Sequence, residues 1–230
     1  MKKSTAAVLM GRFAQPTLYV QRIQNNETTS GTTQSVTFNS NPKSGNLLIL
    51  IVSAGFTLAL PTSTGGTWTK DVTTVANQET SIFSKISNGT ETTISIQASG
   101  GSSLFSCAMI AYEFAGYTTL DKSAVVNAGG NINTASVGPT ATTTASNEIV
   151  IGVCEFGYTN TDTIPGSSTF TAGVTFDCYN HSTNTGATSM DDLITGLLKT
   201  SSTGAYSCTA SWANLLPVLA NTNMLIATYK

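Results

Sequence analysis

Few residues of this chain have the types and spacing that catalysis requires. His181 is the only histidine, and it stands in a polar Asn-His-Ser-Thr stretch. A Ser-His-Asp triad would have to use this residue, yet the sequence contains no Gly-x-Ser-x-Gly elbow. The pattern therefore favours a solvated loop histidine.

Paired carboxylates are also scarce. Asp191 and Asp192 are adjacent, so on a strand their side chains would point to opposite faces. A glycosidase needs two carboxyl groups about 5–10 Å apart across one cleft. Glu113 and Glu155 lie within apolar strand patterns, where each is either buried with partners or solvated at a strand end. We expect no catalytic residues and predict that the protein is not an enzyme.

The cysteines do not have the spacing of a metal site. They are Cys107, Cys154, Cys178 and Cys208. Zinc sites use closely paired cysteines, and no Cys-x-x-Cys occurs here. All except Cys178 fall within apolar strand patterns and are expected to be small buried hydrophobes. No P-loop, dinucleotide or EF-hand motif appears, so we predict no metal and no cofactor; calcium at loop oxygens near Asp162 or Asp177 stays open.

The composition narrows the classes of protein. Charged residues make up 10% of the 230 residues, and the chain holds 40 Thr, 26 Ser and 17 Asn. Thr favours strands, whereas Ser and Asn favour turns, which excludes a helical bundle. A hydrophobic fraction of 40% argues against disorder. A net charge of −2 and a pI near 5.3 argue against nucleic-acid binding, and no apolar run is long enough to span a membrane. We expect neither nucleic acid nor membrane as a partner.

Strand patterns recur along the chain. The apolar run Leu47–Val52 predicts a buried central strand. Asn88-Gly89 predicts a hairpin turn that joins strands over 80–86 and 92–97. Further strands are expected at 18–23, 34–38, 67–70, 104–114, 148–156, 170–176, 187–199, 206–212 and 224–229. Within the strand at 187–199, a short helix over Met190–Leu198 is the alternative.

These segments predict an all-β fold. About twelve short strands at spacings of roughly 8–15 residues are typical of an antiparallel sandwich or barrel. Long crossings favour a jelly-roll-like β-sandwich, which we place at residues 33–230. No internal repeat of fixed period is visible.

The first 32 residues are expected to form a basic extended arm and linker. Residues 1–26 carry +4, from two lysines and two arginines without an acid, and the rest of the chain carries −6. Arg12 and Pro16 interrupt the apolar stretch that a secretion signal needs. A basic arm on an acidic body could dock on an acidic partner.

Several segments resemble a known module. In chain order they read SGNLLILIVSAG, GGTWTK, SIFSKISNGTETTISIQ, AMIAYEFAG, LDKSA, TTTASNEIVIGV and GAYSCTASW…NMLIATYK. Together they resemble the jelly-roll-like β-sandwich module of bacteriophage virion structural proteins, such as decoration and fibre proteins, and of bacterial surface proteins. The resemblance covers about residues 33–230 and brings no catalytic residues with it. It implies a virion surface or appendage protein.

Two functions follow as hypotheses. The first is a head decoration or cement protein of a bacteriophage, a homo-oligomer such as a trimer, assembled in the host cytoplasm and held on the major capsid protein by its arm. The arm residues expected to make contact are Val8, Leu9, Met10, Arg12, Phe13, Leu18, Tyr19, Val20 and Arg22. Tyrosines near predicted loops could form an exposed contact surface, namely Tyr117, Tyr158 and Tyr179. The alternative is a carbohydrate-binding or adhesive module of a tail fibre or bacterial surface, for which Trp68, Trp212 and Tyr158 would be the stacking platform. The strand-type alternation around Trp68 and Trp212 instead favours packing of both in the core.

Overall fold

The computed structural model describes residues 18–25, 31–75, 78–101, 107–129, 132–159, 168–171, 175–183, 189–212 and 219–230, with the backbone alone at residues 75, 156–159, 168–192, 212 and 219–221 within these ranges. This part of the chain forms fifteen strands, all paired antiparallel, and no helix. The predicted all-β antiparallel class is confirmed. The described residues hold no helix capable of crossing a membrane.

The first half of the chain builds one large and one small sheet. The large sheet has the order β1-β7-β3-β5-β4, and β2 pairs with β6 in the small one. The strands are β1 (Gln21–Gln24), β2 (Thr33–Thr37), β3 (Leu47–Ala54), β4 (Thr69–Val75), β5 (Glu79–Ile86), β6 (Thr93–Gln97) and β7 (Cys107–Phe114).

The second half builds a large sheet and a small sheet of its own. The large sheet has the order β12-β13-β10-β15-β8, and the small one has the order β11-β14-β9. The strands are β8 (Leu120–Asn127), β9 (Thr134–Val137), β10 (Ile149–Thr159), β11 (Ser168–Thr171), β12 (Thr175–Thr183), β13 (Ser189–Lys199), β14 (Cys208–Trp212) and β15 (Leu219–Tyr229).

The two halves repeat the same strand order. In each large sheet the first strand of the half lies at the edge, followed by the last strand and then the third. In each small sheet the second strand pairs with the last but one. The residues from Leu58 to Thr62 run beside β6 through isolated bridges, as β11 runs beside β14. The chain is therefore an internally duplicated fold, which the absence of a visible sequence period did not reveal.

Matching contacts support the correspondence between the halves. The Ser87 amide donates to the Asn46 carbonyl at 2.8 Å, and the Thr200 amide donates to the Glu148 carbonyl at the same distance. Both bonds lie where the third strand of the half begins. In β2 and β9 the sequences Thr-Gln-Ser-Val and Thr-Ala-Ser-Val align at residues 33–36 and 134–137.

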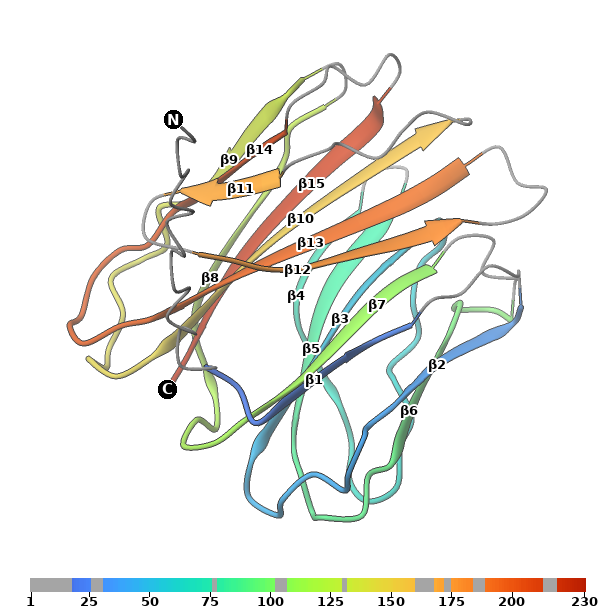
Figure 1. Cartoon of the computed structure of the whole chain (residues 1–230), viewed down its shortest axis with the longest axis vertical. Helices are drawn as coiled ribbons and strands as arrows, with labels where there is room; N and C mark the ends of the chain where they lie inside the picture. The colour runs from blue at the N-terminus through green and yellow to red at the C-terminus, as the bar shows by residue number, and fades with distance from the viewer. Residues whose placement is uncertain are drawn as a thin grey trace, which may run out of the picture.

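Four layers result from this arrangement (Figure 1). The two large sheets face each other across a central core that receives side chains from both halves. The β2-β6 sheet covers the outer face of the first large sheet, around Leu50, Trp68 and Phe83. The β9-β14-β11 sheet covers the outer face of the second, around Val150 and Met224. The small sheets are thus the two outermost layers.

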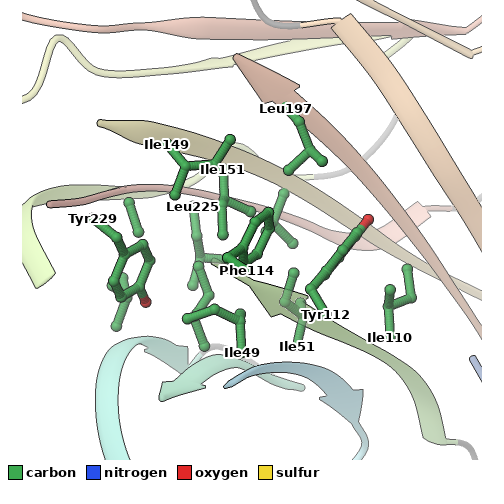
Figure 2. Close-up of a cluster of buried hydrophobic side chains, with 14 of the residues drawn as sticks. Ile49, Ile51, Ile110, Tyr112, Phe114, Ile149, Ile151, Leu197, Leu225 and Tyr229 are labelled. Carbon is green, nitrogen blue, oxygen red and sulfur yellow. The ribbon is translucent and has the colours of Figure 1, made fainter. Parts of the chain in front are cut away.

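Alternation along the strands fills these cores. In β3, Ile49 and Ile51 face the central core, whereas Leu48 and Leu50 face the first outer core. The apolar run at Leu47–Val52 is needed because this strand is buried on both faces, and the predicted buried strand is confirmed. Figure 2 shows how Ile49, Ile149, Phe114 and Tyr229 meet between the large sheets. Each such side chain contributes about 1.5–3 kcal/mol on burial.

Hydrogen bonds also join the two halves. The Tyr112 and Thr195 hydroxyls lie 2.5 Å apart in the central core. The Tyr229 hydroxyl donates to the Asp71 carboxylate at 2.8 Å, and burial raises the pKa of Asp71. Buried polar groups need partners, so these pairs fix how the two large sheets align.

Two local predictions differ from the structure. The Asn88-Gly89 turn does not join a hairpin, because β5 pairs with β3 and β4 whereas β6 pairs with β2 in another layer. The turn therefore crosses between layers. His181 was expected in a loop, but its backbone lies within β12 and pairs with Asp192 of β13. The strand predicted at Met190–Leu198 is confirmed as part of β13.

Candidate functional site

The N-terminal part of the described chain belongs to the large sheet rather than to a free arm. β1 pairs with β7, with Arg22 opposite Tyr112. Leu18 and Tyr19 pack on the central core, and the Tyr19 ring meets Tyr112 at a centroid distance of 5.5 Å. Residues 18–24 thus pack with the large sheet although they fall within the predicted arm and linker, because this segment finds a partner strand in the sheet.

The predicted arm contacts divide into two groups. The Arg22 guanidinium lies over the Tyr19 ring at 5.6 Å, so both side chains contact their own chain. Val20 is 56% exposed at the sheet edge. The other predicted contacts lie outside the described residues, and they are Val8, Leu9, Met10, Arg12 and Phe13. The structure therefore brings only Val20 to an open surface among the predicted contacts that it describes.

The predicted tyrosine surface is not formed at Tyr117. This residue is 7% exposed, and its ring meets Phe114 edge-on at 6.3 Å. Burial raises the pKa of the Tyr117 phenol. The backbones of Tyr158 and Tyr179 lie in β10 and β12 rather than in loops, and their side chains lie outside the description. The loop prediction was wrong for both because these strands extend further than the apolar pattern indicated.

The aromatic platform of the carbohydrate alternative is missing one member. Trp68 is 3% exposed, and its Nε1 donates to Ser63 Oγ at 3.0 Å. It is a core residue of the first half. The Trp212 side chain is not among those described.

Glu113 and Glu155 do not form a catalytic pair. On β7, Tyr112 faces the central core, so Glu113 points to the other face, where it accepts hydrogen bonds from Asn46 Nδ2 at 2.6 Å and the Lys43 amide at 2.8 Å. Glu155 lies on the central face of β10 and accepts from Asn223 Nδ2 at 2.7 Å. A large sheet separates the two carboxylates, and each holds its own surroundings together.

Buried carboxylates hold loops in place by accepting hydrogen bonds from loop residues. Glu91 accepts hydrogen bonds from the amides of Asn88, Gly89 and Thr90, and Lys85 Nζ lies 2.9 Å from it. Burial alone would raise the pKa of Glu91, but hydrogen bonds from Lys85, the Asn88 amide, the Ser87 hydroxyl and its own amide lower it to about 2. The Glu91 carboxylate thus accepts hydrogen bonds from turn amides that cross-strand carbonyl groups would have accepted in a hairpin.

A close pair of carboxylates escaped the sequence reasoning. Asp121 accepts from the Thr144 hydroxyl at 2.6 Å and from Lys230 Nζ at 3.0 Å, whereas Glu148 accepts from the Ala145 amide at 3.2 Å. Burial and the nearby Asp121 raise the pKa of Glu148. Both carboxylates hold one loop. Only the folded chain brings positions 121 and 148 together, since they stand on different elements.

The exposed surface is almost uncharged where side chains are described. All seven described carboxylates are buried or half-buried, namely Asp71, Glu79, Glu91, Glu113, Asp121, Glu148 and Glu155. The exposed charged side chains within the same part are Lys43, Lys199 and Lys230. The predicted acidic body is thus not an acidic surface there, because these acids work as internal acceptors.

The described part of the chain shows no cluster of side chains that could bind a metal ion. Among the described residues, no three His, Cys, Asp or Glu side chains come together as metal ligands would. Cys107, Cys154 and Cys208 are buried, as expected from their apolar surroundings. Asp162 and Asp177, where calcium was left open, have no described side chains.

The outer faces of the small sheets are candidate contact surfaces. On β2 the exposed residues are Thr33, Ser35 and Thr37, and on β9 they are Thr134 and Ser136. None of the strands β2, β6, β9, β11 and β14 contains a charged residue. Ordinary surfaces carry charge on about a quarter to a third of their residues, so these faces are chemically distinct.

No family model, no curated protein and no solved structure matches the chain.

Proposed function

We propose that the protein is a non-enzymatic structural subunit of a virus particle, most specifically a bacteriophage head decoration or cement protein. The observation that carries this proposal is the strand order of each half. In a jelly roll, the first strand lies beside the last, and the second lies beside the last but one, in two facing sheets. Both halves follow this order, so we interpret the chain as two jelly-roll-like units stacked by their large sheets.

Jelly rolls serve viral capsids and lectins alike, so the fold alone does not decide between them. The surface favours a shell component. A described exterior with hydroxyl groups and only three exposed cations permits close packing against neighbours with little charge repulsion. Within the described part of the chain, the carboxylates hold loops from the inside and none of them is an exposed side chain.

Attachment is assigned to residues 1–17, which precede the packed Leu18. This segment carries Lys2, Lys3 and Arg12 without an acid, together with the apolar Val8–Met10 and Phe13. Fully extended, seventeen residues reach about 55–60 Å. The segment enters the fold at the edge strand β1 beside the exposed Val20. Its cations would pair with acidic groups of the major capsid protein, and its apolar residues would add buried contact area.

Deletion of residues 1–17 tests this assignment without removing β1 or the packed Leu18. Purified full-length and truncated proteins would be added to particles that lack the protein, and occupancy would be read by quantitative gel densitometry. We expect the truncated protein to remain folded by circular dichroism and to lose at least tenfold in occupancy. Exchange of Lys43 and Lys199, which are exposed elsewhere, for Glu is the matched charge control and should leave occupancy unchanged. Full occupancy of the truncated protein would contradict the proposal.

A further inference from the structure

Four strands form the edges of the two large sheets. They are β1 and β4 in the first sheet, and β12 and β8 in the second. An edge strand presents backbone N–H and C=O groups outward, and proteins commonly protect such strands by short length, charged residues or bulges. β1 has only four residues. β4 carries Lys70 and Asp71 at a shift in register, and β12 carries Asp177 at another. Three of the four edges thus have a protective feature.

The stretch of β8 from Ser123 to Asn127 lacks these features. The register shift of this strand lies at its start, beside Asp121 and Lys122, and the pairing with β15 is regular from there to Asn127. The stretch contains no charged residue. Val125 is 47% exposed, and Ser123 and Asn127 are exposed as well. A regular, uncharged and exposed edge is a surface to which another strand can add.

The hydrogen bonds of β8 show which backbone groups face the open side. The Ala128 amide donates to the Thr222 carbonyl at 2.8 Å, and the Lys122 amide donates to Thr228 Oγ1 at 3.1 Å. In an antiparallel pair, residues that bond to the neighbouring strand alternate with residues whose N–H and C=O point away from it. The even-numbered residues of β8 therefore bond to β15, whereas the amides and carbonyls of residues 123, 125 and 127 point to the open edge.

We propose that β8 pairs with β8 of a second copy of this chain about a twofold axis at Val125, so that the protein is a dimer in solution. Val125 would lie opposite Val125 of the second copy, and Ser123 would lie opposite Asn127. Each of these opposed pairs exchanges two backbone hydrogen bonds. On the other face of β8, Ala124 and Val126 pack on the second outer core, so the strand is already held in the conformation that pairing requires.

Symmetry and charge favour a second copy as the partner. Antiparallel pairing about a twofold axis uses the same surface on both chains and closes at two. Lys122 would lie opposite the uncharged Ala128, and the two Lys122 positions would be roughly 20 Å apart along the strands, well beyond the screening length of about 8 Å. No like charges would therefore meet. The two exposed Val125 side chains would contact each other, and apolar cross-strand pairs stabilise a sheet.

Charged substitutions at Val125 test this pairing directly. Because the side chain is half exposed, the single chain should stay folded, which circular dichroism checks. Val125→Lys and Val125→Glu each place like charges opposite one another at the axis, whereas a mixture of the two variants places opposite charges there. Val125→Thr is the matched neutral control and keeps a β-branched side chain. Val20→Lys controls for added charge at an exposed position beside another edge strand, β1.

Sedimentation velocity at concentrations up to about 100 μM measures the mass in solution, because a pair with a Kd of about 1 μM is associated there. We expect the natural chain, Val125→Thr and Val20→Lys to show twice the 23.9 kDa of one chain. Each charged Val125 variant alone should raise the Kd at least about tenfold, and their mixture should recover the dimer. Amide hydrogen exchange in the peptide that spans β8 should be slower in the natural dimer than in Val125→Lys.

Several results would overturn the proposal. They are a natural chain that stays monomeric at all these concentrations, a trimer, and a dimer that Val125→Lys leaves intact. The chain without residues 1–17 should dimerise as the natural chain does. A dimer that appears only after this truncation would show that residues 1–17 cover the edge, and a dimer lost on truncation would show that they build the interface; either result contradicts pairing through β8. None of these readings requires a virus particle, so failure here is distinguishable from failure of the proposed function.

Discussion

Replacement of Glu91 by Gln should expose the energetic role of the internal carboxylates. Glu91 is fully buried, contacts Lys85 at 2.9 Å, and accepts three backbone amides from residues 88–90. Its pKa falls from 4.5 to about 2. Since one pKa unit corresponds to about 1.4 kcal/mol, the ionised carboxylate stabilises the folded chain by about 3 kcal/mol.

The sign follows from the lowered pKa. A carboxylate whose pKa is lower in the folded state stabilises fully above its unfolded value, here 4.5, and this stability is lost as the pH falls towards 2. Glu91→Gln lacks the titrating group and also leaves Lys85 buried without its counter-charge. We therefore expect the variant to lose about 3–5 kcal/mol in the free energy of unfolding near neutral pH. The difference from the natural chain should shrink as the pH falls below 4.5.

Urea unfolding followed by tryptophan fluorescence at several pH values between about 2 and 7 measures this difference. The double variant Lys85→Met with Glu91→Gln is the control, because removal of both charges from a buried pair costs far less than removal of one. It should recover at least half of the lost stability. A loss below about 1 kcal/mol for Glu91→Gln near neutral pH, or a difference that does not depend on pH, would refute the reasoning.

Three further predictions concern other buried groups. Tyr112→Phe and Thr195→Val should each lower the free energy of unfolding by about 1–2 kcal/mol, because the two hydroxyls pair across the central core. A double-mutant cycle should give a coupling energy of at least about 0.5 kcal/mol, and additive effects of the two substitutions would contradict the pairing. Glu148 has a raised pKa, so the stability that its protonated form contributes is lost as the pH rises. Glu148→Gln should therefore raise the midpoint of thermal unfolding near pH 7 relative to the natural chain and lose that advantage near pH 4. A variant that is less stable than the natural chain at pH 7 would contradict the raised pKa. Burial raises the pKa of Cys208 to about 12 and also raises the pKa of Cys154. A thiol reagent should therefore modify these residues and the buried Cys107 only at the rate of unfolding. Fast labelling of any of the three in the native protein would contradict their burial.

The sequence was informative where burial and alternation coincide. The run at Leu47–Val52 is apolar on both faces because β3 has a core on each side, and this leaves a local signal. The pairing of β6 with β2 leaves no local signal in the sequence, because Asn88-Gly89 is a residue pair typical of hairpin turns. Its actual path depends on Glu91, which binds the turn amides from outside the turn.

The duplication was hidden for a related reason. The halves share strand order and backbone contacts, but the visible sequence agreement is short, as at residues 33–36 and 134–137. A core position accepts any apolar residue of suitable volume, so the strand order can persist while the sequences differ. The same limit applies to the carboxylates. Apolar context correctly suggested that Glu113 and Glu155 could be buried, but only the layers show that a sheet lies between them.

Quantitative mass spectrometry of gradient-purified virus particles from the source tests the proposed function most directly. A copy number comparable to that of the major shell protein is the predicted result. A handful of copies would point to a fibre or tail position instead of a head decoration. Complete absence from the particles would contradict the proposal that this chain is a virion structural protein.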